Sequence, residues 1–248
     1  MNRKIRNITL AVLAAVAAAA PTLARAQGAT STEAAANPAP VKVATAGAGI
    51  MAGGYVISGV ALGDWADIAG FPLGIDATNV IHRNPKRPWS IRNNLGLMYN
   101  FSRTVDVPQS NLAPNDALEV TTKNTSLLFG VGPEFSKSTG DMRPFIYATA
   151  GFDTYWTSSD LTGTVAGTNY FAKHGDSRMS FAWAAGLGIR RWVVSGEAVE
   201  LSAEYRSGSD HHYLKPDEIT SSGGVVTADR SSRTTDQILI RLGTVIGH

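Results

Sequence analysis

The sequence contains no cysteine. A disulfide framework, a thiolate metal site and a lipid attached through an N-terminal cysteine are therefore excluded. Long hydrophobic runs are also scarce, since no segment after residue 26 stays apolar over the roughly 20 residues that a membrane-spanning helix needs. A membrane location would require a closed β-barrel, because only helices and barrels satisfy all their backbone hydrogen bonds inside hydrocarbon.

Concentrated positive charge is absent as well. The chain has 22 Lys and Arg and 20 Asp and Glu, and the basic residues are scattered singly. Four of the basic residues and none of the acidic ones fall within residues 1–26, so the rest of the chain carries 18 basic and 20 acidic residues, a net charge of −2. Because no basic patch is available to attract phosphates, the sequence predicts no nucleic-acid partner.

Residues 1–26 have the three parts of a secretory signal peptide. A basic start precedes an apolar run over residues 8–20, and the small residues Ala24 and Ala26 stand just before Gln27, where we expect cleavage. Residues 27–47 are rich in Ala, Thr, Ser and Pro without periodicity, which predicts a disordered periplasmic lead-in. The folded domain is then expected to occupy residues 48–248.

From residue 48 onward, short stretches alternate between apolar and polar residues, and no helical period persists. In the clearest stretch, Leu95, Leu97 and Tyr99 share one face and Asn94 and Gly96 share the other. This alternation predicts an all-β domain with eight antiparallel, up-and-down strands. The expected strands are Gly54–Leu62, Phe71–Ile81, Trp89–Phe101, Ser126–Phe135, Pro144–Trp156, Met179–Trp192, Ala198–Arg206 and Thr235–Ile246.

The connections between these strands alternate in length. Residues 136–143 and 193–197 form tight turns, whereas residues 104–123, 158–177 and 207–234 predict long polar loops. Transmembrane barrels combine short periplasmic turns with long outer loops in this way. Extra hairpins within residues 158–177 and 207–234 would instead give ten strands.

The two faces of the strands differ in a way that indicates the surrounding solvent. One face carries charges interleaved with small residues such as Gly130 and Gly186, and the other carries large apolar residues such as Leu97 and Ile146. Small residues suit the crowded interior of a narrow barrel, so we expect the apolar face to contact lipid. Aromatic residues near strand ends predict interfacial girdles; they include Phe101, Phe135, Phe145, Tyr155, Trp156, Trp183 and Tyr205. The alternative is a soluble β-sandwich with these aromatics in its core.

The predicted interior face also holds charges of both signs. Unpaired charges would be costly there, so we expect a salt-bridged network. Its predicted members are Arg92, Glu134, Asp153, Arg190, Glu200, Glu204, Arg206 and Arg241. An eight-stranded barrel has room for little more than its own side chains, which favours a static plug over a gate that passes small ions.

Three segments resemble the small outer-membrane β-barrels of the OmpA-like and OmpX-like type. They are residues 143–151, with Arg143-Pro144-Phe145 at their start, residues 181–188 and the Glu204-Tyr205-Arg206 stretch. The resemblance covers about residues 48–248 and implies a place in the outer membrane of a Gram-negative bacterium. It also implies contact with lipopolysaccharide, barrel-assembly machinery and periplasmic chaperones, and outer loops that serve envelope structure, adhesion or the binding of a host or surface ligand.

Candidate chemistry is sparse. Ser209-Asp210-His211-His212 contains the residue types of a hydrolytic triad or a metal site, but adjacent residues point apart on a strand. His82 and His174 have no carboxylate at metal-ligand spacing. The sequence therefore predicts no catalytic residue, cofactor or metal, and no enzyme. Two alternatives stay open: an outer-membrane lipid-modifying enzyme, and a soluble periplasmic or secreted β-protein that binds an apolar ligand.

Overall fold

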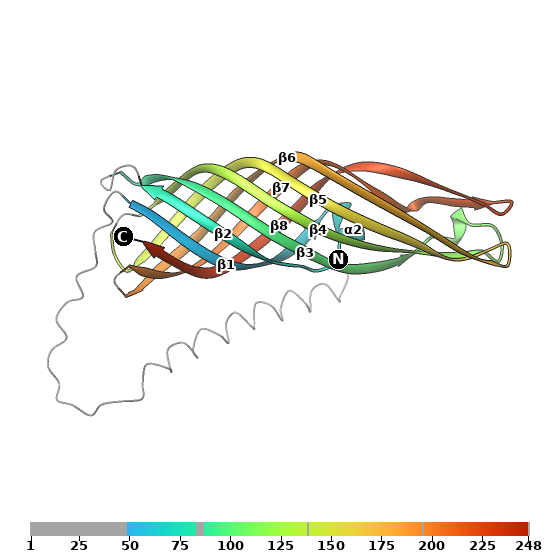
Figure 1. The fold of residues 1–248 in the computed structure, drawn as a ribbon, viewed down its shortest axis with the longest axis horizontal. Helices are drawn as coiled ribbons and strands as arrows, with labels where there is room; N and C mark the ends of the chain where they lie inside the picture. The colour runs from blue at the N-terminus through green and yellow to red at the C-terminus, as the bar shows by residue number, and fades with distance from the viewer. Residues whose placement is uncertain (1–48, 83–86, 138, 195, 248) are drawn as a thin grey trace, which may run out of the picture. The chain divides into compact units, whose positions relative to one another are not determined.

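The computed structural model describes residues 49–82, 87–137, 139–194 and 196–247. Eight antiparallel strands, each beside its predecessor in the chain, form a closed barrel through the pairing of the first with the last (Figure 1). The strands are β1 (Gly49–Leu62), β2 (Pro72–His82), β3 (Trp89–Asp106), β4 (Ala117–Ser136), β5 (Met142–Val165), β6 (Thr168–Val194), β7 (Glu197–Ser222) and β8 (Val225–Gly247). The predicted fold class is confirmed with eight strands, and the ten-strand alternative is wrong. The predicted signal peptide and lead-in lie outside the described residues.

The connections define two ends of the barrel. At the end that we call inner, the turns after β4 and β6 are short, as predicted. At the opposite, outer end lie the β1–β2 connection with helix α2 (Trp65–Ile68), and the β3–β4 connection with the short 3₁₀ helix η1 (Gln109–Asn111). The hairpins β5–β6 and β7–β8 project furthest from this end (Figure 1).

The long polar loops predicted at the outer end are wrong for residues 158–177 and 207–234. Both segments continue existing strands, and each hairpin closes in a two-residue turn. Ala166 and Gly167 have φ of 50° and 74°, and Gly223 and Gly224 have φ of 59° and 81°. Positive φ at both turn positions is typical of the type I′ turn, whose twist matches that of the strands. The polar composition of these stretches is typical of loops, but their backbones pair with neighbouring strands.

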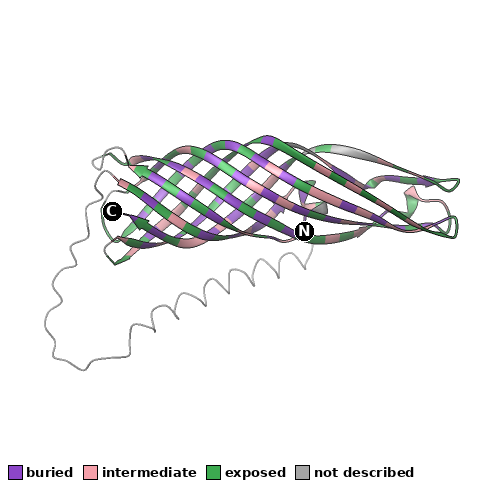
Figure 2. Cartoon of the chain, in the orientation of Figure 1, coloured by how far each residue is buried: buried purple, intermediate pink, exposed green. Residues whose placement is uncertain are grey.

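The side chains alternate between the barrel interior and its exterior along every strand (Figure 2). The interior contains three apolar clusters: one that includes Met51, Ile57 and Leu239, one around Trp65, and one at the outer end. In the middle of the barrel, polar and charged side chains lie at the same level as the first of these clusters, since Leu239 pairs in register with Glu204 and Leu128 with Asp153. This polar middle is the candidate functional site.

Candidate functional site: a charged barrel interior

The eight charged residues predicted for the interior come from β3, β4, β5, β6, β7 and β8. Each is almost completely buried, with between 0 and 2% of its surface exposed. The strands bring them together because their side chains occupy the inward positions of the pleat. Gly186 makes room for Tyr147, a hydrogen-bond partner of Glu204, since a Cβ at Gly186 would lie 2.4 Å from the Tyr147 ring.

Four of these residues form a closed cycle of ion pairs toward the inner end. Arg92 contacts Glu134 at 2.9 Å and Glu200 at 3.0 Å, and Arg190 contacts the same two carboxylates at 2.7 and 2.5 Å. The Arg190 guanidinium also lies 4.3 Å from the centre of the Phe145 ring. Two positive and two negative charges are thus neutralised within the cycle, which is what their removal from water requires.

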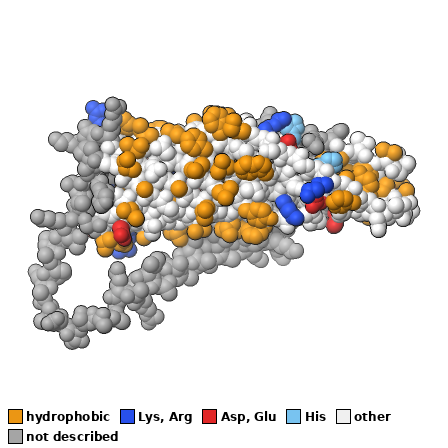
Figure 3. Space-filling model, viewed as in Figure 1, with side chains coloured by type: hydrophobic (Ala, Val, Ile, Leu, Met, Phe, Trp, Pro, Cys, Tyr) orange, Lys and Arg blue, Asp and Glu red, His pale blue; other side chains and the backbone are white. Residues whose placement is uncertain are grey.

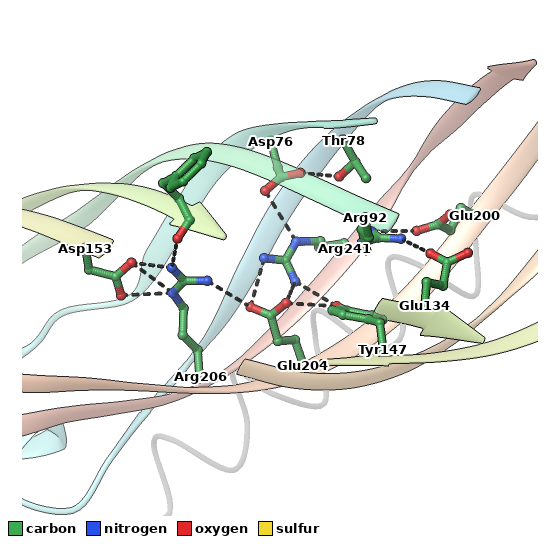
Figure 4. A network of polar contacts seen from close by, with 11 residues as sticks. Asp76, Thr78, Arg92, Glu134, Tyr147, Asp153, Glu200, Glu204, Arg206 and Arg241 are labelled. Atoms are coloured by element: carbon green, nitrogen blue, oxygen red, sulfur yellow. Dashed lines mark hydrogen bonds and ion pairs between the residues drawn. The ribbon is translucent and has the colours of Figure 1, made fainter. Parts of the chain in front are cut away.

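A second group lies beside this cycle (Figure 4). Arg241 contacts Glu204 at 2.6 Å and Asp76 at 3.5 Å, and the Tyr147 hydroxyl donates a hydrogen bond to Glu204 at 2.9 Å. Arg206 forms an ion pair with Asp153 and lies 3.7 Å from Glu204. The network therefore extends continuously from Asp153 to Asp76 across the barrel.

Sequence reasoning missed Asp76 and Tyr147. Asp76 lies on β2, where Gly74, Asp76 and Thr78 alternate with apolar residues, but polar Asn79 and apolar Val80 then reverse the pattern. Tyr147 faces inward, as do Phe145 and Tyr155 on the same strand. The prediction that Phe145 and Tyr155 belong to an interfacial girdle is therefore wrong. The charge at Arg143, which is inward on the same strand, was the available signal for the direction of these aromatics.

Helix α2 closes the interior above the charged network. Trp65 packs against Tyr155 at 5.7 Å and Tyr213 at 6.0 Å between ring centres. The Arg103 guanidinium donates a hydrogen bond to the Ala66 carbonyl and thereby fixes the helix to β3. Above Trp65 lies the third apolar cluster, which consists of Val107, Leu118, Val120, Leu161, Val165, Leu214 and Ile219.

The exterior of the barrel is apolar where the interior is charged. The side chains of Leu97, Ile146 and Leu187 are 47, 59 and 63% exposed. Water-soluble monomers rarely expose large aliphatic side chains over a continuous surface. Figure 3 shows hydrophobic side chains over the visible face of the body of the barrel, and charged side chains near the two ends of that body. Phe101, Phe135, Trp156, Trp183 and Tyr205 all point outward.

The other candidate residues do not converge on a site of recognisable chemistry. His212 and His174 line one small pocket between β6 and β7, whereas His82 lies at the far end of β2. The side chains of Asp210 and His211 lie outside the described part of the chain. Among the described residues, no group of three or more His, Asp or Glu could hold a metal ion, and no helix is long and apolar enough to cross a membrane.

A closed eight-stranded antiparallel barrel with charges inside and hydrocarbon side chains outside has the fold of the small outer-membrane β-barrels. Among solved structures, the chain is similar to the attachment invasion locus protein Ail of Yersinia pestis, with a TM-score of 0.43 and 12% identity over 82% of this chain and 99% of that one. A major outer membrane protein from Thermus thermophilus gives a TM-score of 0.46 and 12% identity over 79% and 99%.

The outer membrane protease OmpT from Escherichia coli gives a TM-score of 0.39 and 8% identity over 88% of this chain and 100% of that one. No protein-family model matches the sequence, and no curated protein matches it significantly. At these identities the likeness concerns the fold alone.

Proposed function

We propose that this chain is a non-enzymatic integral protein of the Gram-negative outer membrane that displays its outer strand hairpins to surface ligands. The observation that carries the proposal is the distribution of polarity in the body of the barrel. Ten charged residues are buried there, namely the eight predicted ones together with Asp76 and Arg143, while the outward positions of the same strands hold large apolar side chains. That arrangement has a favourable free energy when hydrocarbon surrounds the barrel.

The interior supports a structural plug better than a pore. The cycle of Arg92, Glu134, Arg190 and Glu200 satisfies its own charges, so no ion is needed to compensate them. Trp65 and the apolar cluster above it add two further layers along the axis. An ion would have to break ion pairs and then pass apolar side chains, and both steps are costly.

Assembly and lipid contacts follow from the same proposal. An exported barrel requires periplasmic chaperones and barrel-assembly machinery, and its apolar exterior would contact membrane lipid and lipopolysaccharide. The outer hairpins would then stand outside the membrane, where a rigid scaffold suits them to envelope structure, adhesion or ligand binding.

Gel migration with and without boiling tests the location together with the fold. Detergent-extracted protein is expected to migrate differently before and after boiling, and cell fractionation should recover it with outer membranes. Recovery in the detergent-free periplasm would contradict the membrane assignment and favour a soluble β-protein. Currents of porin size in planar bilayers would contradict the plug.

A further inference from the structure

Two asparagine side chains lie on the outside of the barrel, within its apolar belt. Asn79 on β2 and Asn93 on β3 occupy directly opposed positions of the sheet, and both face outward. Along β3 the outward positions on either side of Asn93 are apolar, and Trp89 and Tyr99 lie beyond them toward the two ends. Because aromatic girdles bound the lipid-facing band of transmembrane β-barrels, both amides fall within the band that hydrocarbon would surround.

The hydrogen-bonding capacity of these two amides is unused. Within the part of the chain that the structure describes, neither Asn79 nor Asn93 has a side-chain hydrogen bond. Each amide carries two N–H donors and an acceptor oxygen, so the other amide across the strand could satisfy only part of this capacity. Hydrocarbon offers no water to satisfy the remainder, and an unsatisfied polar group is costly there. Polar side chains at this depth therefore indicate a partner.

The surface around the two amides is formed by small residues. In the register of the sheet, Asn79 pairs with Ala52 on β1, and Ala77 on β2 pairs with Gly54 on β1. We call these four residues, together with Asn93, the amide patch. Larger apolar side chains frame the amide patch toward both ends of the barrel: Ile50, Ile81 and Ile91 on the inner side, and Val56, Ile75 and Leu97 on the outer side.

The barrel itself does not require glycine at position 54. A Cβ on Gly54 would meet no atom within 4 Å, and the backbone there is outside the left-handed region. Among the glycines that the structure describes, Gly54 alone combines these two properties. Glycine weakens a strand because it adds conformational entropy to the unfolded chain, and it often marks a place where another backbone approaches closely. Gly54 thus indicates a neighbour outside the barrel.

We propose that the amide patch on β1, β2 and β3 is the surface through which two copies of this chain associate in the membrane. Both copies insert in the same direction, so a two-fold axis along the membrane normal brings the patch against itself. Complementarity of partial charge favours a second copy, because the Asn79 and Asn93 amides of one copy can both donate to and accept from those of the other. Small residues such as Gly54 let the two backbones approach, as they do between membrane helices. The inference rests on the proposed membrane location and adds a partner to it.

Energy transfer between labelled copies in lipid vesicles tests the association. The chain has no cysteine, so Asn169→Cys, near the outer end of β6, gives a single labelling site away from the amide patch. Vesicles that contain donor-labelled and acceptor-labelled full chain should show transfer that saturates with the protein-to-lipid ratio. Unlabelled protein should compete this transfer away. Transfer no greater than that of randomly distributed monomers would overturn the inference.

Variants of the patch locate the contact. Gly54→Ile places a branched side chain between the two backbones and should weaken association at least about tenfold, although the space outside its own barrel accepts the side chain. Asn79→Leu combined with Asn93→Leu should weaken association by about tenfold, because the amide contacts are lost. Ala185→Ile, outward on β6 at the opposite side of the barrel, is the matched control and should have no effect. Unchanged association of both patch variants, or an equal loss in Ala185→Ile, would contradict the assigned surface.

Photo-cross-linking in outer membranes identifies the occupant. A benzophenone attached to Ile50→Cys, at the rim of the patch, should give a cross-linked species of twice the mass of the chain. The same label on Leu187→Cys, which is similarly exposed on β6, should not. Cross-links from Ile50→Cys to a different protein, or to lipid alone, would overturn the inference. A heat-modifiable protein that stays monomeric would overturn this inference alone, whereas recovery in the detergent-free periplasm would overturn the proposed function.

Discussion

The interior of the body of the barrel holds buried ion pairs beside apolar residues, whereas the interior of its outer extension, which comprises residues 104–122, 157–178 and 209–234, is largely apolar. On β7, the inward residues of the body include Glu200 and Glu204, whereas those of the extension include Leu214 and Ile219. The same change occurs on β5, from Asp153 to Leu161. One continuous strand thus carries both patterns, as expected if hydrocarbon surrounds the body and water surrounds the extension under the proposed function.

The extension is built as a water-soluble β-structure would be, with an apolar interior and polar cross-strand contacts. Thr104 and Thr121 share a hydrogen bond of 2.8 Å, and Thr162 donates one of 3.0 Å to Glu119. The body has the opposite arrangement, with ion pairs inside and aliphatic side chains outside. The level at which the pattern changes marks the outer boundary of the membrane under the proposed function.

The largest expected difference between the two regions concerns their ion pairs. Arg190→Met leaves Glu134 and Glu200 with Arg92 as their remaining partner in the buried cycle, so we expect the free energy of unfolding to fall by about 3–5 kcal/mol. Lys215→Met removes the more exposed Lys215–Asp217 pair and should cost about 0–1 kcal/mol. Urea unfolding of both variants in the same detergent measures the two effects. Equal losses would contradict the distinction between the regions.

A new charge on the exterior should also separate the regions, with a somewhat smaller effect. Ile146→Arg places a cation on the lipid-facing side of the body and should cost about 2–4 kcal/mol in a bilayer, provided that its position is near the midplane. Phe171→Arg, in the extension, should change stability little because water already surrounds that position. Unfolding in lipid vesicles is the measurement. If Ile146→Arg leaves the stability unchanged, β5 does not contact hydrocarbon at that position.

The body of the barrel was predictable from the sequence where its alternation is strong, which excludes part of β2. Once a strand such as Trp89–Asp106 is placed, Leu95 and Leu97 must face away from Arg92, and the charges must then meet in the middle. The sequence places charged residues on inward positions, but it does not specify which pairs form. The pairing of Arg92 with both Glu134 and Glu200 depends on the registers of strands far apart in the chain.

The extension was not predictable in the same way. Hydrophobic periodicity favours strands where one face is buried, and the segments near His174 and Lys215 carry short polar runs that interrupt it. The turns at Ala166-Gly167 and Gly223-Gly224 were the available signals, since glycine after a short strand is typical of hairpins. The pairing of β6 with β7 ends at Ala182 and Gly208, next to a register break between β7 and β8, and composition encodes neither feature.

The smallest predicted effect concerns the contact that joins two hairpins at the outer tip. Asp116 accepts hydrogen bonds from the Ala166 backbone N–H at 2.9 Å and from the Ser221 hydroxyl at 2.7 Å. These bonds, the first above all, hold the pKa of Asp116 below its ordinary value of 3.8. A lowered pKa in the folded state means that the contact stabilises the tip above the ordinary pKa and is lost as the pH falls through the lower, folded value.

The Ala166 amide resonance in an NMR titration should therefore shift at acid pH. In Asp116→Asn it should not titrate there, while the gel migration of the barrel stays as in the parent protein. An Ala166 resonance that still titrates in Asp116→Asn would show that another group controls the tip.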